Sequence, residues 1–225
     1  MTDPDQPTVA RRSFVAGLHE TRTTWKTTGA TWGVQIDLTP IGAYRIFGLP
    51  LSDLANLVVD ATNLFGPGIA QLEQRLFDAR SWDDRFDLID GFLMAKLLVG
   101  PRESNEIAWV WHQVRSTGGN VRIALLADKL GWSRKRLISA CRDQLGLSPK
   151  MLGRVLRFQH VLKLNDNDGS ASWSDLAYKS GYCDRAHLVR EYRTFTGIAP
   201  GCIGEMRLRQ SPGNFYPRRR SDHFS

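Results

Sequence analysis

Apolar residues change their spacing along this chain of 225 residues, and the change separates a short strand-like part from a long helical part. Between Thr21 and Leu38 apolar residues alternate with smaller or polar ones, at Trp32, Val34, Ile36 and Leu38. An alternation of period two is typical of a β-strand, and Gly29 provides a turn between two strands. Pro40 is expected to end this segment.

The spacing then becomes helical and predicts helices at about 51–58, 69–77, 81–99 and 104–115. Ser81 suits the N-cap of the third helix, because its hydroxyl can accept a backbone N–H and Asp83-Asp84 favours the positive end of the helix dipole. Gly100-Pro101 is expected to stop that helix. The fourth helix has an apolar face made of Ile107, Val110 and Val114.

The C-terminal half of the chain repeats itself. At an offset of 50 residues, Leu126-Ala127 aligns with Leu176-Ala177, and Gly131-Trp132 aligns with Gly181-Tyr182. At an offset of 51, the second copy matches Gly146, Leu147 and Pro149 with Gly197, Ile198 and Pro200. Two units therefore share one plan, and the second is longer by one residue inside its later helix.

Each unit has the anatomy of a helix-turn-helix motif. Ala127 or Ala177 lets the second helix cross closely over the first, and the glycine four residues later can take the positive φ of the turn. An aromatic residue follows, and then an N-cap residue, Ser133 or Asp184. The inner faces are expected to be Leu126, Leu130, Leu137, Ala140 and Cys141 in the first unit and Leu176, Leu188, Tyr192 and Phe195 in the second. The alternative reading is a plain helical bundle.

A long helix is expected between the two units. It starts at Ser148-Pro149 and runs to Leu164, with a buried side made of Leu152, Val155, Leu156, Val161 and Leu162. A helix of about 16 residues is about 24 Å long and forms a stiff spacer. The polar turn at 165–169 is then the soft point of the connection.

Charge is distributed unevenly over the chain. Residues 1–116 carry 11 Lys and Arg against 14 Asp and Glu, a formal charge of −3, whereas residues 117–225 carry 19 against 9, a formal charge of +10. The basic excess of the second half favours a polyanionic partner; a solubilising surface is the alternative. The basic run at 218–220 is interpreted as a solvated end of the chain.

The three cysteines are far apart, at Cys141, Cys183 and Cys202, and form no metal-binding spacing. We therefore expect no metal and no cofactor, a reduced cytoplasmic compartment, and three buried or idle thiols. No apolar run approaches the roughly 18 residues of a membrane span, so no membrane association is expected. The N-terminus has no apolar core typical of a signal peptide.

Residues 121–207 resemble the C-terminal domain of the arabinose-operon regulator (AraC/XylS) family of transcription regulators. The resemblance is carried by the two repeated units, by Gly146-Leu147-Ser148-Pro149, by Arg157-Phe158, and by Thr196-Gly197-Ile198-Ala199-Pro200. This chain departs from the family pattern at Cys141, Tyr192 and Ile203, all apolar enough to pack. The resemblance implies a seven-helix domain that places two recognition helices in successive major grooves. It also implies a preceding domain for effector binding or dimerisation. Residues 33–98 resemble the later, helical part of such a domain.

The faces of the two recognition helices opposite the apolar residues are the candidate DNA contacts. By the resemblance, Lys135, Ile138 and Ser139 contact base edges; on the second helix Arg185, Ala186, Val189 and Arg190 are left for the groove. Arg190 could equally hold a phosphate. Further phosphate contacts are expected at Arg134, Arg142, Lys150, Arg154 and Thr196, the last three as residues near helix starts. His187 and Glu191 lie four residues apart and are expected to pair with each other.

The sequence thus predicts a mainly α fold with three parts. These are a partial sensor or dimerisation region at 1–116, in which a short β segment precedes helices, an all-α domain with tandem helix-turn-helix units at 117–210, and a basic disordered tail at 211–225. The expected partner is double-stranded DNA. RNA polymerase, a small-molecule effector of unknown identity and a second copy of the chain are further candidate partners, the last through Leu72/Leu76 and Phe86/Ile89/Phe92/Leu93.

The two alternative classes of function are an enzyme and a protein-interaction module. His19, His112 and Asp83-Asp84 are the best catalytic material, but none has a partner at motif spacing. Asp83-Asp84 is better explained as a helix start, and neither a phosphate-binding glycine loop nor a nucleophile elbow is present. The sequence therefore favours a regulator that is not an enzyme.

Overall fold

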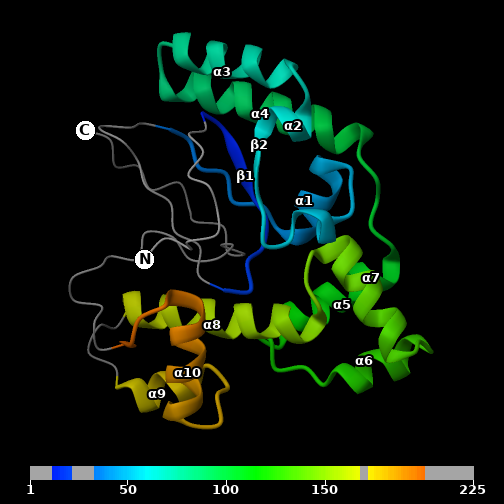
Figure 1. The fold of residues 1–225 in the computed structure, drawn as a ribbon, viewed down its shortest axis with the longest axis vertical. Coiled ribbons are helices and arrows are strands. Elements are labelled where there is room, and N and C mark those ends of the chain that lie inside the picture. Colours follow the sequence, from blue (N-terminus) through cyan, green and yellow to red (C-terminus); the bar gives the residue numbers. More distant parts are fainter. Residues whose placement is uncertain (1–11, 22–32, 168–171, 201–225) are drawn as a thin grey trace.

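The computed structural model describes residues 12–21, 33–167 and 172–200. This part of the chain is mainly helical and contains one small two-stranded sheet, so the predicted fold class is confirmed. Figure 1 shows the sheet and the first helices in one half of the molecule and the C-terminal helices in the other. Within the described ranges, none of the helices combines the length and apolarity that a membrane span requires.

The sheet forms from different residues than the alternation predicted. β1 (Phe14–Ala16) pairs antiparallel with β2 (Val58–Asp60), with Val15 opposite Val59. Residues 33–39 have no strand, and residues 22–32 lie outside the described part. The predicted strands over 21–38 are therefore wrong where they can be compared, because a strand needs a hydrogen-bonded partner that local alternation does not supply.

Pro40 begins a helix instead of ending a segment. It is the first residue of α1 (Pro40–Phe47), where the missing N–H of proline costs nothing, and the Thr39 hydroxyl accepts the N–H of Gly42. The helix expected at 51–58 is a single 3₁₀ turn, η1 (Leu51–Leu54), followed by β2 and the short α2 (Ala61–Phe65). Sheet pairing therefore overrides the helical spacing at Leu57 and Val58.

The next two helices agree with the sequence. α3 (Gly68–Asp78) and α4 (Trp82–Val99) pack against each other in the N-terminal half of the molecule. Ser81 and Asp84 form a capping box, in which the Ser81 hydroxyl accepts the Asp84 N–H and the Asp84 carboxylate accepts the Ser81 N–H. The chain leaves the helix at Gly100, as expected.

α5 (Asn105–Ser116) packs with the C-terminal helices, although the expected domain boundary follows it. Its fully buried residues Ile107, Val110 and Val114 share one apolar core with residues of the later helices. It packs against α7 (Arg134–Leu145) and α8 (Pro149–Asn167). α5 therefore shares the core of the C-terminal helices, and the boundary after Ser116 stays a prediction.

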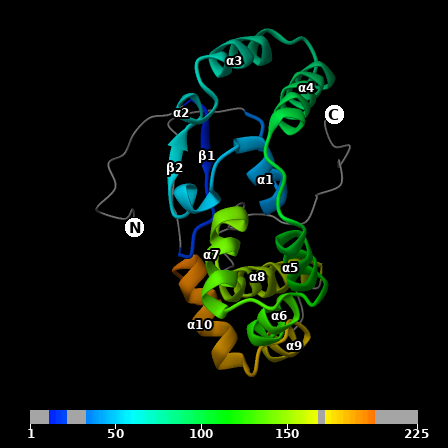
Figure 2. The ribbon, with the colours of Figure 1, turned by 90° about the vertical axis from the view of Figure 1, so that its right-hand side faces the viewer.

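The C-terminal half consists of two helix pairs on either side of a long helix. The first pair is α6 (Ile123–Leu130) and α7 (Arg134–Leu145), the long helix is α8 (Pro149–Asn167), and the second pair is α9 (Trp173–Lys179) and α10 (Arg185–Thr196). α8 is longer than expected: it ends at Asn167 instead of Leu164. Figure 2 shows α7 and α10 along one side of this half, with α6 and α9 toward the other.

One apolar core joins the two helix pairs. Tyr192 and Phe195 of α10 belong to the same buried cluster as Leu137 and Cys141 of α7 and the residues of α5. Phe158 of α8 lies between them, with its ring 4.9 Å from that of Phe195 and 5.5 Å from that of Tyr192. α8 is therefore packed over its length and is more than a free spacer.

The N-terminal half contacts the end of α7. η1 and α1 both pack on this helix, and Leu51 lies against Gly146, which ends it. Arg45 of α1 forms a two-pronged ion pair with Glu103, with N–O distances of 2.6 and 3.0 Å. The side chain of Gln144 in α7 accepts the N–H of Ser104. The loop before α5 thus bridges α1 and α7.

Candidate nucleic-acid interface

The two helix pairs make the same turn. Gly131 and Gly181 have positive φ values of 62° and 74°. The N–H of the aromatic residue that follows, Trp132 or Tyr182, donates in both pairs to the carbonyl of the alanine five residues earlier, at 3.0 Å. The residues that align at an offset of 50 in the sequence therefore also make the same backbone hydrogen bond.

The second helices of both pairs begin and end in the same way. The Ser133 hydroxyl accepts the N–H of Arg136 at the start of α7, and the Asp184 carboxylate accepts the N–H of His187 at the start of α10. Gly146 and Gly197 close the helices in left-handed conformation, with φ values of 80° and 74°. The N-caps predicted from the sequence are confirmed. The extra residue of the second unit is not inside its later helix, as expected, because α7 and α10 both have 12 residues; it lies in the turn, at Cys183.

The predicted base-reading residues lie on the outer faces of these helices. On α7, Lys135 and Ser139 are exposed and Ile138 is half-buried. On α10, Arg185, Ala186 and Arg190 are exposed and Val189 is half-buried. The inner faces are closed by Leu137 and Cys141 and by Leu188 and Tyr192, each with no exposed surface. The structure thus brings each predicted set together on one face, and DNA contact by these residues stays a prediction.

The predicted phosphate contacts fall into two groups. Arg134, Arg142 and Lys150 are exposed, as a phosphate contact requires. Arg154 differs, because its Nε donates to Glu191 at 2.6 Å and its guanidinium lies over the ring of Phe195. Thr196 differs as well, since it ends α10 instead of lying near a helix start and its buried hydroxyl donates to the carbonyl of Tyr192. In this conformation both side chains are used within the protein.

A family model described as a helix-turn-helix domain matches residues 126–205, from within α6 to beyond α10. The chain carries an AraC-type helix-turn-helix domain. The predicted resemblance is confirmed for this region of the chain. No curated protein matches the chain.

Solved structures of ToxT from Vibrio cholerae are similar to part of the chain. A structure at 1.65 Å resolution has 18% sequence identity and a TM-score of 0.40, with 53% of this chain and 47% of that chain covered. A structure of ToxT with a bound unsaturated fatty acid has 17% identity and a TM-score of 0.38, with 53% and 45% covered. The match spans about half the length of each of these ToxT chains.

The helix-turn-helix domain contains a polar network that the sequence did not reveal. Glu191 of α10 is 5% exposed and accepts hydrogen bonds from Arg154 of α8 and from the hydroxyl of Tyr182. Burial, and then the Glu191 carboxylate, raises the pKa of Tyr182, so the phenol stays a donor at neutral pH. The sequence predicted only the pair of His187 with Glu191, which the structure has at 3.8 Å. Arg154 lies 37 residues away, beyond any local pattern.

The cysteines of the domain differ in their surroundings. Burial raises the pKa of the Cys141 thiol to about 12, so this cysteine is an inert part of the core. Cys183 is exposed in the turn immediately before α10. Of the three thiols expected to be buried or idle, Cys141 is buried and Cys183 is exposed, and Cys202 lies outside the described residues. The exposed thiol of Cys183 is therefore accessible to chemical labelling beside the start of α10.

The residues weighed as catalytic material have other surroundings. Asp84 accepts the backbone N–H of Ser81 in the capping box of α4, and His112 is exposed on α5. His19 follows β1, and burial lowers the pKa of its imidazole. These residues lie on separate elements, and the contact made by Asp84 is a structural one, a helix cap.

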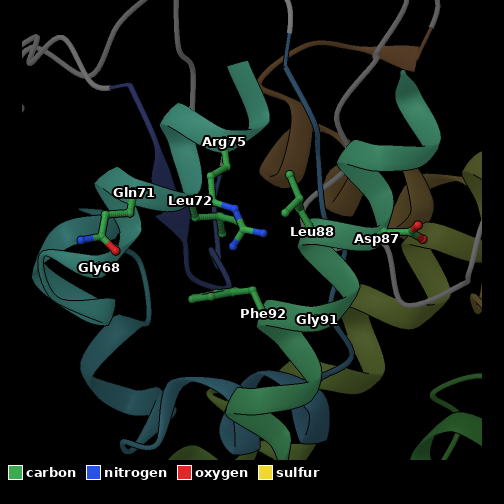
Figure 3. A pocket seen from close by; sticks show the side chains of 8 residues that line it. All are labelled: Gly68, Gln71, Leu72, Arg75, Asp87, Leu88, Gly91 and Phe92. Atoms are coloured by element: carbon green, nitrogen blue, oxygen red, sulfur yellow. The ribbon is translucent and has the colours of Figure 1, made fainter. Parts of the chain in front are cut away.

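A solvent-open hollow of about 350 Å³ lies between α3 and α4 (Figure 3). Its walls include Leu72 from α3 and Leu88 and Phe92 from α4, and Arg75 points from α3 into the space between the helices. The hollow is built entirely from this helix pair. It is therefore no part of the candidate nucleic-acid interface on α7 and α10.

Proposed function

We propose that the chain is a sequence-specific transcription regulator in which both helix pairs work as helix-turn-helix units on one DNA duplex. In this proposal α7 and α10 enter successive major grooves, and their exposed N-terminal turns read the bases. The observation that carries the proposal is the repeated turn geometry, with the same hydrogen bond from Trp132 and Tyr182 and an exposed basic helix start after each.

Charge and side-chain chemistry support this reading. The long side chains of Lys135 and Arg185 can donate to the O6 and N7 acceptors of guanine, and the apolar Ile138 can pack on a thymine methyl group. Arg134, Arg142 and Lys150 can hold the phosphates on either side. Both recognition helices lie along the same side of the C-terminal half, which suits one continuous duplex.

Selection of binding sites from random duplex DNA by the full chain is expected to give a motif with two separate boxes. Lys135→Ala should change the preferred bases in one box and Arg185→Ala those in the other, each at a cost of about 1–3 kcal/mol at particular base pairs. The measurement is the sequence profile selected by each variant.

Lys179→Ala is the matched control for this selection. Lys179 is exposed on α9, which lies toward the other side of the domain, so its loss should leave both boxes unchanged. If the profiles of Lys135→Ala and Arg185→Ala equalled that of the wild-type chain, the proposed reading faces of α7 and α10 would be wrong.

We further propose that a second copy of the chain binds the α3–α4 pair. The faces expected to dimerise are partly used within the chain, since Phe92 packs on Phe65 and Ile89 is buried. Other apolar residues stay exposed, above all Leu98 at 80% and Val99 at 83% at the end of α4. Exposed apolar residues that gather in this way are typical of an interaction surface.

Sedimentation of the full chain at micromolar concentration is expected to show a dimer, and Leu98→Lys should shift it to a monomer. The lysine side chain would bury a charge in the apolar contact, which is unfavourable without a partner. A monomeric wild-type chain at this concentration would contradict self-association. Leu125→Lys, at an exposed position of α6, serves as the control.

A further inference from the structure

The buried carboxylate of Glu191 connects the second recognition helix to α8. Its Oε1 accepts the Nε–H of Arg154 at 2.6 Å, and its Oε2 accepts the hydroxyl of Tyr182 at 2.9 Å. A second guanidinium, that of Arg157, lies 4.0 Å from Oε1. The carboxylate is therefore compensated by two cations of the long helix, as a buried charge requires.

Arg157 extends this network to the segment that leads into the first helix pair. Its Nη1 donates to the carbonyl of Gly119 at 2.8 Å. Gly119 and Gly153 of α8 touch backbone to backbone, because a Cβ built on Gly119 would lie 2.2 Å from the Gly153 carbonyl oxygen. The turn before α6 is thus held against α8 by a charged donor and by a contact that excludes any side chain.

The same turn reaches the second helix pair directly. A Cβ built on Gly181 would lie 2.1 Å from Nδ2 of Asn120, so the Asn120 side chain lies against the turn between α9 and α10. The two pairs are therefore connected in three ways, through α8, through Arg157 and through Asn120. Residues 165–167 of the polar turn that was expected as the soft point are instead part of α8, and residues 168 and 169 lie outside the described part of the chain.

We propose that Glu191, acting through Arg154 and Arg157, is a positioning residue that sets the distance and angle between α7 and α10. The proposal rests on the proposed function, and it names the feature that fixes which spacing between the two DNA boxes the chain accepts. Apolar packing around Phe158 holds the helices together but is non-directional. The hydrogen bonds to the carboxylate are directional and define one angle between α10 and α8.

The test is a spacing series on the DNA that the full wild-type chain selects, with one or two base pairs added or removed between the boxes. One base pair moves the second box by about 3.4 Å and rotates it by about 34°. For a rigid pair of units, each step is expected to weaken binding about 10-fold, whereas for Glu191→Gln the whole series should stay within about 3-fold. The best affinity of the variant should also fall, because a looser connection lowers the effective concentration of the second unit.

Two further variants make the outcome decisive. Arg157→Gln removes the hydrogen bond to Gly119 and leaves Glu191 with Arg154, so it should flatten the spacing series even if Glu191→Gln fails to fold. Asp128→Asn removes one negative charge from an exposed position of α6 and should keep the sharp wild-type series. Thermal unfolding of each variant shows whether it is folded.

The outcomes separate the two proposals. A wild-type chain that selects no DNA would overturn the proposed function itself. If the wild-type chain binds with a sharp spacing preference and the folded variants keep it, the positioning role of Glu191 is wrong and the proposed function stands. Uniform weakening at every spacing, without flattening, would show a purely structural role and would also overturn the positioning role.

Discussion

Inserting five base pairs between the two boxes of a selected DNA is expected to lower the affinity of the full chain about 10²-fold or more, to that of a single box. Five base pairs rotate the second major groove by about half a turn of the duplex, to its far side. α10 cannot follow, because Arg154, Arg157 and Asn120 hold the second helix pair against α8 and the turn before α6. Titration of a labelled duplex measures the change.

A second readout shows which unit loses contact. Cys183 is exposed immediately before α10, so DNA in the neighbouring groove should slow its alkylation. The protection should be present on the selected DNA and absent on the DNA with the insertion, whereas buried Cys141 stays unreactive on both. A Cys202→Ser background leaves Cys183 as the reporter. Unchanged affinity and unchanged protection would show that the two units act independently.

Raising the salt concentration from 50 to 200 mM is expected to lower DNA affinity about 10³-fold, if six or more phosphates are contacted. Each contact releases condensed counterions, and the residues from 117 onward carry a formal charge of +10. The plot of log affinity against log salt should therefore be linear and steep. A flat response would argue against phosphate contacts and against DNA as the partner.

Lys150→Gln and Lys179→Gln form the matched pair for this titration. Lys150 is exposed at the start of α8, where a phosphate contact is predicted, and its loss should reduce the slope by about one. Lys179 is also exposed, on α9, and should leave the slope unchanged. The full chain is the right material, because a fragment that starts at Gly118 would lack α5 and open the core around Ile107 and Val110.

The helical repeat is the part of this protein that could be predicted from sequence. Each of its features depends on residues only a few positions away in the sequence. These features are the turn glycines Gly131 and Gly181, the N-caps Ser133 and Asp184, and the apolar inner faces. Local backbone preference and helical spacing are therefore enough to define them. The same holds for Ser81 as an N-cap and for the outward placement of Lys135 and Arg185.

The N-terminal sheet could not be predicted in this way. Its strands come from residues 14–16 and 58–60, which are separated by α1 and η1, and nothing local marks Val59 as the partner of Val15. The alternation at 33–38 is more typical of a strand than either of them, yet these described residues form no strand. Strand formation depends on pairing at a distance, and a pattern within one segment carries no information about its partner.

The sequence by itself determined two copies of one helical plan, their caps, their basic outer faces and the family to which this region belongs. Only the tertiary structure decided that α5 belongs to the core of the C-terminal helices, that Arg154 is used by Glu191, and that Asn120 lies against Gly181. The physical reason is the separation along the chain over which each interaction acts. Helix and turn preferences act over three or four residues, whereas burial and charge compensation join residues that only folding brings together.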